Sequence, residues 1–158
     1  MTGKIAVGGI TQTDDLVLLR VLGSRAGSRF ANCTLSTLGE ANINIVCCAA
    51  VGDDRERQNL GLAIHHKDLD QALGLLQEVR EAIGAERIEV RRRCSALAVY
   101  GPQFSSSPAI GGRIFAAVDQ DGIPVHMIST SFTTVAFLVD TDMAAAAQAS
   151  LRQAFQVP

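Results

Sequence analysis

The polar residues that could perform chemistry in this sequence form no catalytic arrangement. The sequence shows no order of Ser, His and Asp typical of a nucleophilic triad, no Walker phosphate loop and no paired carboxylates that would flank a pocket. Hydroxyl groups instead gather at residues 105–107 and 129–131, and Arg25 and Arg29 flank a short loop. Turn and cap chemistry or contacts to a ligand would each explain these runs. The sequence therefore favours binding over catalysis.

The cysteines predict neither a metal site nor a redox site. Cys33, Cys47, Cys48 and Cys94 form no CxxC pair and have no Cys/His ligand spacing. Cys47 and Cys48 are adjacent within a strand pattern, so their side chains point to opposite faces. We interpret all four as small hydrophobic residues in a reducing cytoplasm, and we expect no cofactor.

The composition is that of a globular protein. The chain has 158 residues, of which 47% are hydrophobic and 19% are charged, and its net charge is -2. This charge implies no basic face, and only 4% of the residues are aromatic, so nucleic acid is not expected as a partner. The start of the chain lacks a signal-peptide pattern, and no apolar run is long enough to cross a bilayer. We therefore expect a soluble, cytoplasmic protein that does not bind membranes.

An internal repeat decides the expected architecture. Residues 41–50 are a helix end that runs into a buried strand, and residues 121–130 repeat this pattern. An offset of 80 residues pairs Phe30 with Ile110, Leu35 with Phe115, Leu38 with Val118, and Ile43 with Ile123. The sequence thus predicts two copies of one unit.

Each copy reads as strand, helix, strand, strand, helix, with a final strand in the first copy. A strand at residues 4–11 and a turn at residues 13–15 precede the first copy, and Ser28 and Ser107 are the expected helix caps. In the first copy we expect strands at 16–22, 43–50, 59–65 and 86–93, and helices from 28 to 41 and from 68 to 83. In the second we expect strands at 95–101, 123–130 and 133–139, and helices from 108 to 118 and from 142 to 155.

The second copy lacks a last strand, whereas the strand at residues 4–11 is spare. A four-stranded antiparallel sheet without one edge would leave backbone groups unpaired, so we expect the spare strand to complete the second copy. The predicted fold is α+β, with two ferredoxin-like βαββαβ units and the first inserted into the second. The expected boundaries are residues 14–93 for the first unit, and residues 3–12 plus 94–158 for the second.

A duplicated βαββαβ unit with a short loop before each first helix resembles a tandem pair of ACT domains. Four segments resemble the regulatory region of the aspartokinases in particular, and the resemblance covers residues 9–155. Residues 123–131 resemble the family's INIxMISTS, 40–44 its EAGIN, 77–90 its EEVxEEIGAExxEV, and 106–115 its SxPGVAARMF. The family also inserts its first ACT unit into its second. The ordered set is specific, although no single segment is.

The resemblance implies a binding site for an effector amino acid, such as threonine or lysine, at the interface of two chains. The family's effector loop PDKPG aligns with residues 25–29, and Ala26 stands where the family has Asp. A loop that leads into a helix offers backbone N–H groups and a favourable dipole to a carboxylate. The ligand-binding residues expected from the resemblance are Arg25, Ala26, Gly27, Ser28, Arg29, Phe30, Ala50, Val51, Ser129, Thr130 and Ser131.

The resemblance also implies a regulatory role. Aspartokinases carry an amino-acid kinase domain ahead of this region, and we expect none before Lys4, so the chain should not be an enzyme. We expect a homodimer formed through the ACT units and an aspartokinase catalytic chain as a possible partner. Two alternatives stay open: a chain that takes part in kinase activity within an aspartate kinase complex, or a dimerisation module with a degenerate effector site.

Overall fold

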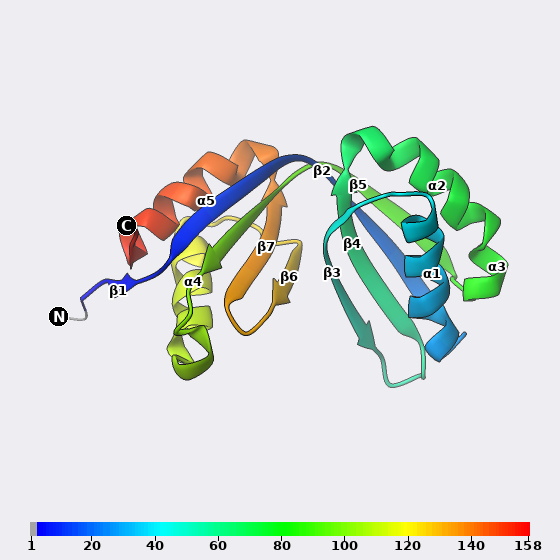
Figure 1. Ribbon diagram of the computed structural model, residues 1–158, viewed down its shortest axis with the longest axis horizontal. Helices are drawn as coiled ribbons and strands as arrows, with labels where there is room; N and C mark the ends of the chain where they lie inside the picture. The colour runs from blue at the N-terminus through cyan, green and yellow to red at the C-terminus, as the bar shows by residue number, and fades with distance from the viewer. Residues whose placement is uncertain (1–2) are drawn as a thin grey trace. The chain divides into compact units, whose positions relative to one another are not determined.

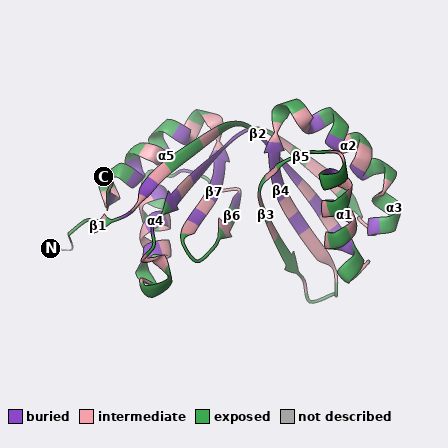
Figure 2. Cartoon of the chain, viewed as in Figure 1, coloured by how far each residue is buried: buried purple, intermediate pink, exposed green. Residues whose placement is uncertain are grey.

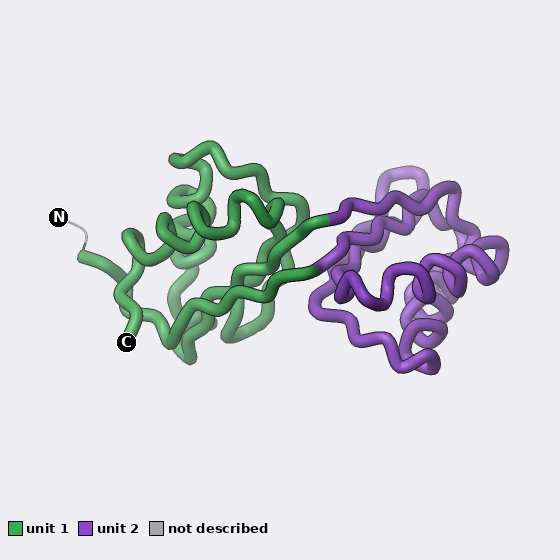
Figure 3. Tube along the Cα trace, turned by 90° about the horizontal axis from the view of Figure 1, so that it is seen from above, with its two compact units in different colours: residues 1–15, 93–158 green, residues 16–92 purple. Residues whose placement is uncertain are grey.

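The computed structural model describes residues 3–158, which form two compact units (Figure 3). Residues 16–92 form the inserted unit, drawn in purple. Residues 3–15 and 93–158 form the split unit, drawn in green. Two long strands, β2 (Gly9–Ser24) and β5 (Arg87–Tyr100), run from one unit into the other. The chain order therefore places one α/β unit inside another.

The inserted unit contains four strands in the sheet order β3-β4-β2-β5, with helices packed on them (Figure 1). Its strand β4 pairs antiparallel with both β2 and β3. Besides the two long strands, its elements are α1 (Ser28–Glu40), β3 (Ile45–Gly52), β4 (Gln58–His65), the 3-10 helix η1 (His66–Asp68), α2 (Leu69–Glu78) and α3 (Arg80–Ile83). Strand β3 is the edge of this sheet.

The core of the inserted unit follows from two sequence periods. Phe30, Thr34 and Leu38 recur every four residues, so they share one face of α1 and are buried. Alternate residues of β2, such as Val17 and Leu19, point to the same core. The helices bury this face and expose the other (Figure 2). The other buried members are Val21, Ile43, Leu60, Leu62, Ile64, Leu69, Ala72, Leu76 and Ile83.

The split unit has its own core and its own sheet order, β2-β5-β7-β6. Phe115 and Phe137 meet edge to face within it, with ring centroids 5.5 Å apart. Its further elements are β1 (Ile5–Ala6), the 3-10 helix η2 (Phe104–Ser106), α4 (Ala109–Gln120), β6 (Met127–Thr130), β7 (Thr134–Asp140), α5 (Thr141–Ala154) and β8 (Phe155–Gln156). Strand β6 is an edge of this sheet.

The N-terminal segment completes the split unit, as the sequence predicted. The first part of β2 lies beside β5, and β1 pairs in parallel with β8, with Ile5 opposite Phe155. Val7 is buried in the core of this unit, and its N–H donates to the carbonyl of Gln156 at 3.0 Å. The predicted fold class, with one ferredoxin-like unit inserted into the other, is confirmed.

The predicted turn at residues 13–15 is wrong. Strand β2 continues through this segment, and Asp15 adopts a left-handed conformation with φ 57° without reversing the chain. Strand β5 likewise continues through Arg93, which has the same φ. The Ser95 hydroxyl donates to Asp14 Oδ1 at 2.7 Å, so this carboxylate joins two strands instead of closing a turn.

The helix starts differ by one residue from the expected caps. Gly27, with φ 61°, precedes α1, and no side chain caps this helix, so the predicted Ser28 cap is wrong. In the second copy Pro108 is the residue before the helix, and Ser107 accepts a bond from the N–H of Ile110 through its carbonyl. Asn42, with φ 60°, follows the end of α1 in the left-handed conformation.

No helix among residues 3–158 is long and apolar enough to cross a membrane.

Gly9 supports a close contact that an added methyl group would disturb. A Cβ atom at Gly9 would lie 2.3 Å from the Tyr100 hydroxyl oxygen and 2.5 Å from its Cζ. We expect Gly9→Ala to displace this ring and lower the free energy of unfolding by about 1–3 kcal/mol. Gly39→Ala is the control, because nothing lies within 4 Å of that position. In this helix alanine should raise stability by about 0.5–1 kcal/mol. Urea unfolding measures both, and equal effects would contradict the contact.

Candidate ligand-binding site

The predicted binding residues of the first copy gather at one end of the inserted unit's sheet. Strand register places Gly52 opposite Gln58 and Gln58 opposite Ser24, which makes one row across β3, β4 and β2. The loop at residues 25–27 leaves this row from β2, whereas Ala50 and Val51 precede it on β3, with β4 between the two strands. The structure therefore brings the predicted loop and the predicted strand end to the same end of one sheet.

Ser24 anchors the loop at residues 25–27 through its side chain. This side chain is fully buried; its hydroxyl donates to the carbonyl of Ile83 and accepts a bond from the Ala26 N–H at 3.2 Å. Gly84, with φ 63°, ends α3 directly against the loop, since a Cβ there would lie 3.5 Å from the Ala26 nitrogen. The loop is thus held against the end of α3.

The start of α1 presents a positive end to solvent. The N–H groups of Arg29 and Phe30 donate to the carbonyls of Ala26 and Gly27, at 3.3 Å and 3.1 Å. The first turn contains no acidic residue, no side chain caps the helix, and Arg25 and Arg29 are exposed. An uncapped helix start flanked by guanidinium groups favours an anionic group such as a carboxylate.

Phe30 differs from the other predicted binding residues. Its side chain is 1% exposed and belongs to the core of the inserted unit, so a ligand at the loop cannot reach its ring. Gly27 and Ser28 are exposed beside it, and Ala26 is half-buried. On the edge strand, Ala50 is exposed and Val51 is 68% exposed.

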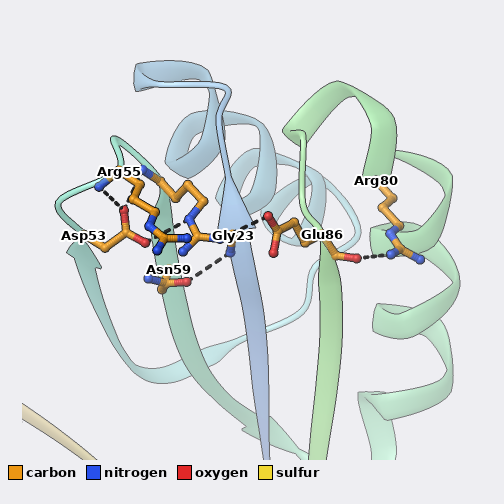
Figure 4. A network of polar contacts seen from close by, with 7 residues as sticks. Gly23, Asp53, Arg55, Asn59, Arg80 and Glu86 are labelled. Atoms are coloured by element: carbon orange, nitrogen blue, oxygen red, sulfur yellow. Dashed lines mark hydrogen bonds and ion pairs between the residues drawn. The ribbon is translucent and has the colours of Figure 1, made fainter.

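An ion-pair network through Arg57 connects Asp53, in the β3–β4 turn, to Glu86, the residue before β5; Figure 4 labels both acidic residues. The Arg57 guanidinium lies 3.0 Å from Asp53 Oδ2 through Nε and 3.2 Å from Glu86 Oε1 through Nη1. The N–H groups of Arg55 and Arg57 also donate to Asp53 Oδ1, at 2.8 Å and 3.0 Å. The sequence alone gives no sign of this network, because Arg57 and Glu86 are 29 residues apart.

The same network holds the end of β2. The Gly23 N–H donates to Asn59 Oδ1 at 3.0 Å, and the Glu86 N–H donates to the carbonyl of Leu22 at 2.9 Å. Gly23 has φ 74°, and a Cβ there would meet the Glu86 side chain at 2.7 Å. Arg80 donates to the carbonyl of Glu86 from α3 (Figure 4). The end of β2, from which the loop at residues 25–27 starts, is therefore held by hydrogen bonds to Asn59 and Glu86.

The Asp53 network predicts a loss of stability in acid. The N–H of Arg57, followed by other bonds from Arg55 and Arg57, lowers the pKa of Asp53 from its ordinary value of 3.8. A lowered pKa contributes stability that is complete above the ordinary value and is lost as the pH falls through the folded-state value. We expect the urea midpoint to fall between pH 5 and pH 3, and Asp53→Asn to reduce this fall. Asp54→Asn, in the same turn, is the control, and an equal reduction by both variants would contradict the prediction.

Ser129, Thr130 and Ser131 lie in the split unit, at the corresponding end of its sheet. Thr130 is the last residue of β6, and the N–H of Ser131 donates to the carbonyl of Thr134 at 2.8 Å in the turn to β7. The Gly101 N–H donates to the carbonyl of Thr133 at 2.9 Å, which places the loop before α4 beside this turn. These three residues therefore lie at the end of the split unit's own sheet, in a different unit from the loop before α1.

The loop before α4 is longer than its counterpart and closed by its own contacts. The Gln103 side chain donates to the carbonyl of Ala6, and the Ser106 hydroxyl donates to the carbonyl of Gln103 at 3.0 Å. Phe104 packs against the core of the split unit. Turn chemistry thus accounts for the Ser106 hydroxyl. Sequence reasoning missed Gln103, whose partner Ala6 lies near the start of the chain.

Across residues 3–158, no group of three or more His, Cys, Asp or Glu side chains could hold a metal ion.

Residues 97–155 match the family model described as an ACT domain. Aspartokinase 2 of Bacillus subtilis (strain 168) is 25% identical over 158 residues, which cover 99% of this chain and 38% of that protein. An aspartokinase of Thermus thermophilus is 25% identical over 154 residues, which cover 96% of this chain and 38% of that protein. The chain thus spans less than two fifths of the length of these relatives.

Solved structures match almost from end to end. The ligand-free regulatory subunit of aspartate kinase from Thermus thermophilus has a TM-score of 0.86 at 23% identity, with 96% of this chain and 99% of that chain covered. A chain in a structure of aspartokinase alpha and beta subunits has a TM-score of 0.84 at 26% identity, with 94% and 98% covered. The resemblance predicted from the sequence is confirmed.

Proposed function

Because this chain resembles the regulatory region of the aspartokinases over nearly its whole length, we propose that it is a non-catalytic regulatory chain that senses a free amino acid. The chain has the ACT-type architecture of a separate regulatory subunit, and a kinase domain is not part of that architecture. The observation that carries the proposal is the uncapped start of α1 beside an anchored loop and an open strand end.

The ligand's carboxylate would bind at the start of α1. There the N–H groups of Gly27 and Ser28 and the guanidinium groups of Arg25 and Arg29 supply positive potential. The ligand's ammonium group needs an acceptor, which the family's loop Asp provides and Ala26 does not. A backbone carbonyl at the open edge of β3, at Ala50 or Val51, and groups from a second chain would supply it. The ligand class is an aspartate-family amino acid such as threonine or lysine.

A second copy of the chain would complete the site. Strands β3 and β6 are edges, and each carries exposed large hydrophobic residues: Val46 and Val51 on β3, and Ile128 on β6 with Phe132 in the following turn. Phe132 is 84% exposed. An open strand edge with apolar side chains favours pairing with another chain. A homodimer through the ACT units would cover these edges and bring a second chain to each loop.

The regulated partner would be an aspartokinase catalytic chain. One similar structure contains aspartokinase alpha and beta subunits, and one of its chains is matched over 98% of its length. An effector that stabilises one arrangement of the ACT units would act on the partner through a coupling free energy of about 1–3 kcal/mol. Both chains would work in the cytoplasm, where amino-acid biosynthesis takes place.

Calorimetric titration with threonine, lysine and methionine tests the proposal. We expect one of them to bind saturably, with one site per chain or per dimer. Arg29→Ala should weaken this binding at least tenfold, because it removes a charge-assisted bond of about 1.5–3 kcal/mol. Arg152→Ala, an exposed arginine of α5, is the matched control and should bind normally. Absence of saturable heat with all three amino acids would contradict the sensing function.

A dimerisation module without an effector is the second candidate, and Ala26 in place of the family's Asp favours it. In that case the chain would form a stable dimer and bind none of the three amino acids. Co-purification with a kinase chain from the native host would separate a subunit from a solitary sensor. Phosphoryl transfer to aspartate by the isolated chain would contradict both candidates.

A further inference from the structure

A polar pocket lies between the C-terminal end of α4 and the C-terminal end of α5. It belongs to the split unit and lies away from the loops that precede α1 and α4. Its volume is about 180 Å³, and Ala117, Gln120, Asp121, Ser150, Gln153 and Ala154 line it. We propose that this pocket binds the ammonium group of a small aliphatic amine. The proposal goes beyond the effector function and uses none of its residues.

The end of α4 concentrates negative potential at the pocket. The carbonyl end of a helix carries a partial negative charge, which a basic residue in the last turn usually balances. In α4 the last turn has no basic residue; instead Asp119 lies in that turn and Asp121 directly follows it. A carboxylate at this position repels the partial negative charge at the helix end. A cation bound to the carboxylate would make the net interaction with the helix end favourable.

Ser150 holds the Asp121 carboxylate against α5. The Ser150 side chain is 5% exposed, and its hydroxyl contacts Asp121 Oδ2 and the carbonyl of Ala146, the latter at 2.9 Å. This contact joins two elements 29 residues apart and fixes the carboxylate at the wall of the pocket. The acceptor is therefore positioned before any ligand arrives.

The first copy of the repeat lacks this carboxylate. The 80-residue offset places Ala41 where the second copy has Asp121, and Glu40 where it has Gln120. Ala41 likewise follows the last residue of its helix, α1, but offers no acceptor to a cation. The carboxylate is thus not a requirement of the shared fold.

The lining decides the class of ligand. One carboxylate and the amide oxygens of Gln120 and Gln153 are acceptors for a single positive charge. No cluster suited to a metal ion occurs within the described chain, which disfavours a divalent cation. The methyl groups of Ala117 and Ala154 can contact a short carbon chain. A volume of about 180 Å³ is below that of pockets for drug-sized ligands, so the ligand has few heavy atoms.

Titration of the full chain with n-propylamine hydrochloride, followed by amide NMR shifts, tests the proposal. We expect saturable shifts at Ala117, Asp121 and Ala154 with a dissociation constant of about 1–10 mM, as befits a ligand of four heavy atoms. Propan-1-ol and matched sodium chloride should produce no such shifts. Equal shifts with propan-1-ol, or none with the amine, would overturn the proposal.

Three variants separate recognition by the pocket from general attraction of cations to the helix end. Asp121→Asn should weaken binding at least tenfold, whereas Asp119→Asn, at the same helix end but outside the pocket lining, should weaken it far less. Gln153→Lys should place its own ammonium group in the pocket, block the amine and raise the melting temperature. Equal weakening by both Asp variants would mean that only the helix end attracts cations. Failure of the effector titration would leave these outcomes unaffected, because they involve different residues.

Discussion

Phe30→Ala is expected to lower the free energy of unfolding by about 3–5 kcal/mol, which is the usual cost of emptying a buried aromatic site. The Phe30 ring is 1% exposed and packs in the core of the inserted unit beneath the proposed effector loop. Stabilities of small proteins are about 5–15 kcal/mol, so the variant should be close to unfolding at 37 °C. Urea unfolding followed by circular dichroism measures the change.

A second substitution separates the core role of Phe30 from a ligand role. Phe30→Leu keeps most of the apolar volume and should cost only about 1–1.5 kcal/mol. Because the ring faces the core, we expect Phe30→Leu to bind the effector with unchanged affinity. A clear loss of affinity in a stably folded Phe30→Leu protein would restore the ligand role that the sequence alignment gave to this residue.

Charged substitutions on the two strand edges are expected to separate the proposed homodimer. Val51 on β3 and Ile128 on β6 are 68% and 45% exposed, so Val51→Lys and Ile128→Lys should leave each unit folded. Within an interface each lysine would lose solvation and repel its symmetry mate. We expect the double variant to raise the dimer dissociation constant at least 100-fold, or about 2.8 kcal/mol at 1.4 kcal/mol per factor of ten.

Sedimentation velocity over a range of concentrations measures this effect. Ala145→Lys on the exposed face of α5 is the control and should remain dimeric. The single variants identify which edge dominates. A double variant that remains dimeric at the same concentrations would place the interface away from both edges, and the proposed site would then need another source for its second chain.

The helices and the copy number were open to prediction because their signals are local. Phe30, Thr34 and Leu38 share a helix face in any fold that buries that face, and Asn42 ends the helix through its own backbone preference. The same stripe already placed Phe30 inward. Its place among the expected ligand-binding residues came from the resemblance and stays a prediction, which Phe30→Leu tests.

Strand continuity was not open to prediction in the same way. Asp14 and Asp15 have turn-forming side chains, yet β2 continues through them, and Asp14 accepts a hydrogen bond from Ser95 of β5. That contact joins residues 81 positions apart, so no local pattern contains it. The tertiary structure overrode a local preference because the strand bonds on both sides are more numerous than the turn bond they replace.

The features of the candidate site fall into the same two groups, those that local sequence predicts and those that depend on tertiary contacts. The sequence by itself determined the repeat, the insertion of one unit into the other, the resemblance to the aspartokinase regulatory region and the loop that leads into α1. Only the tertiary structure decided that Ser24 and Gly84 hold this loop, that Arg57 joins Asp53 to Glu86, and that Asp121 meets Ser150 at a pocket. Periodicity and backbone preference act between near neighbours, whereas ion pairs and pockets depend on which distant residues the strand register and helix packing bring together.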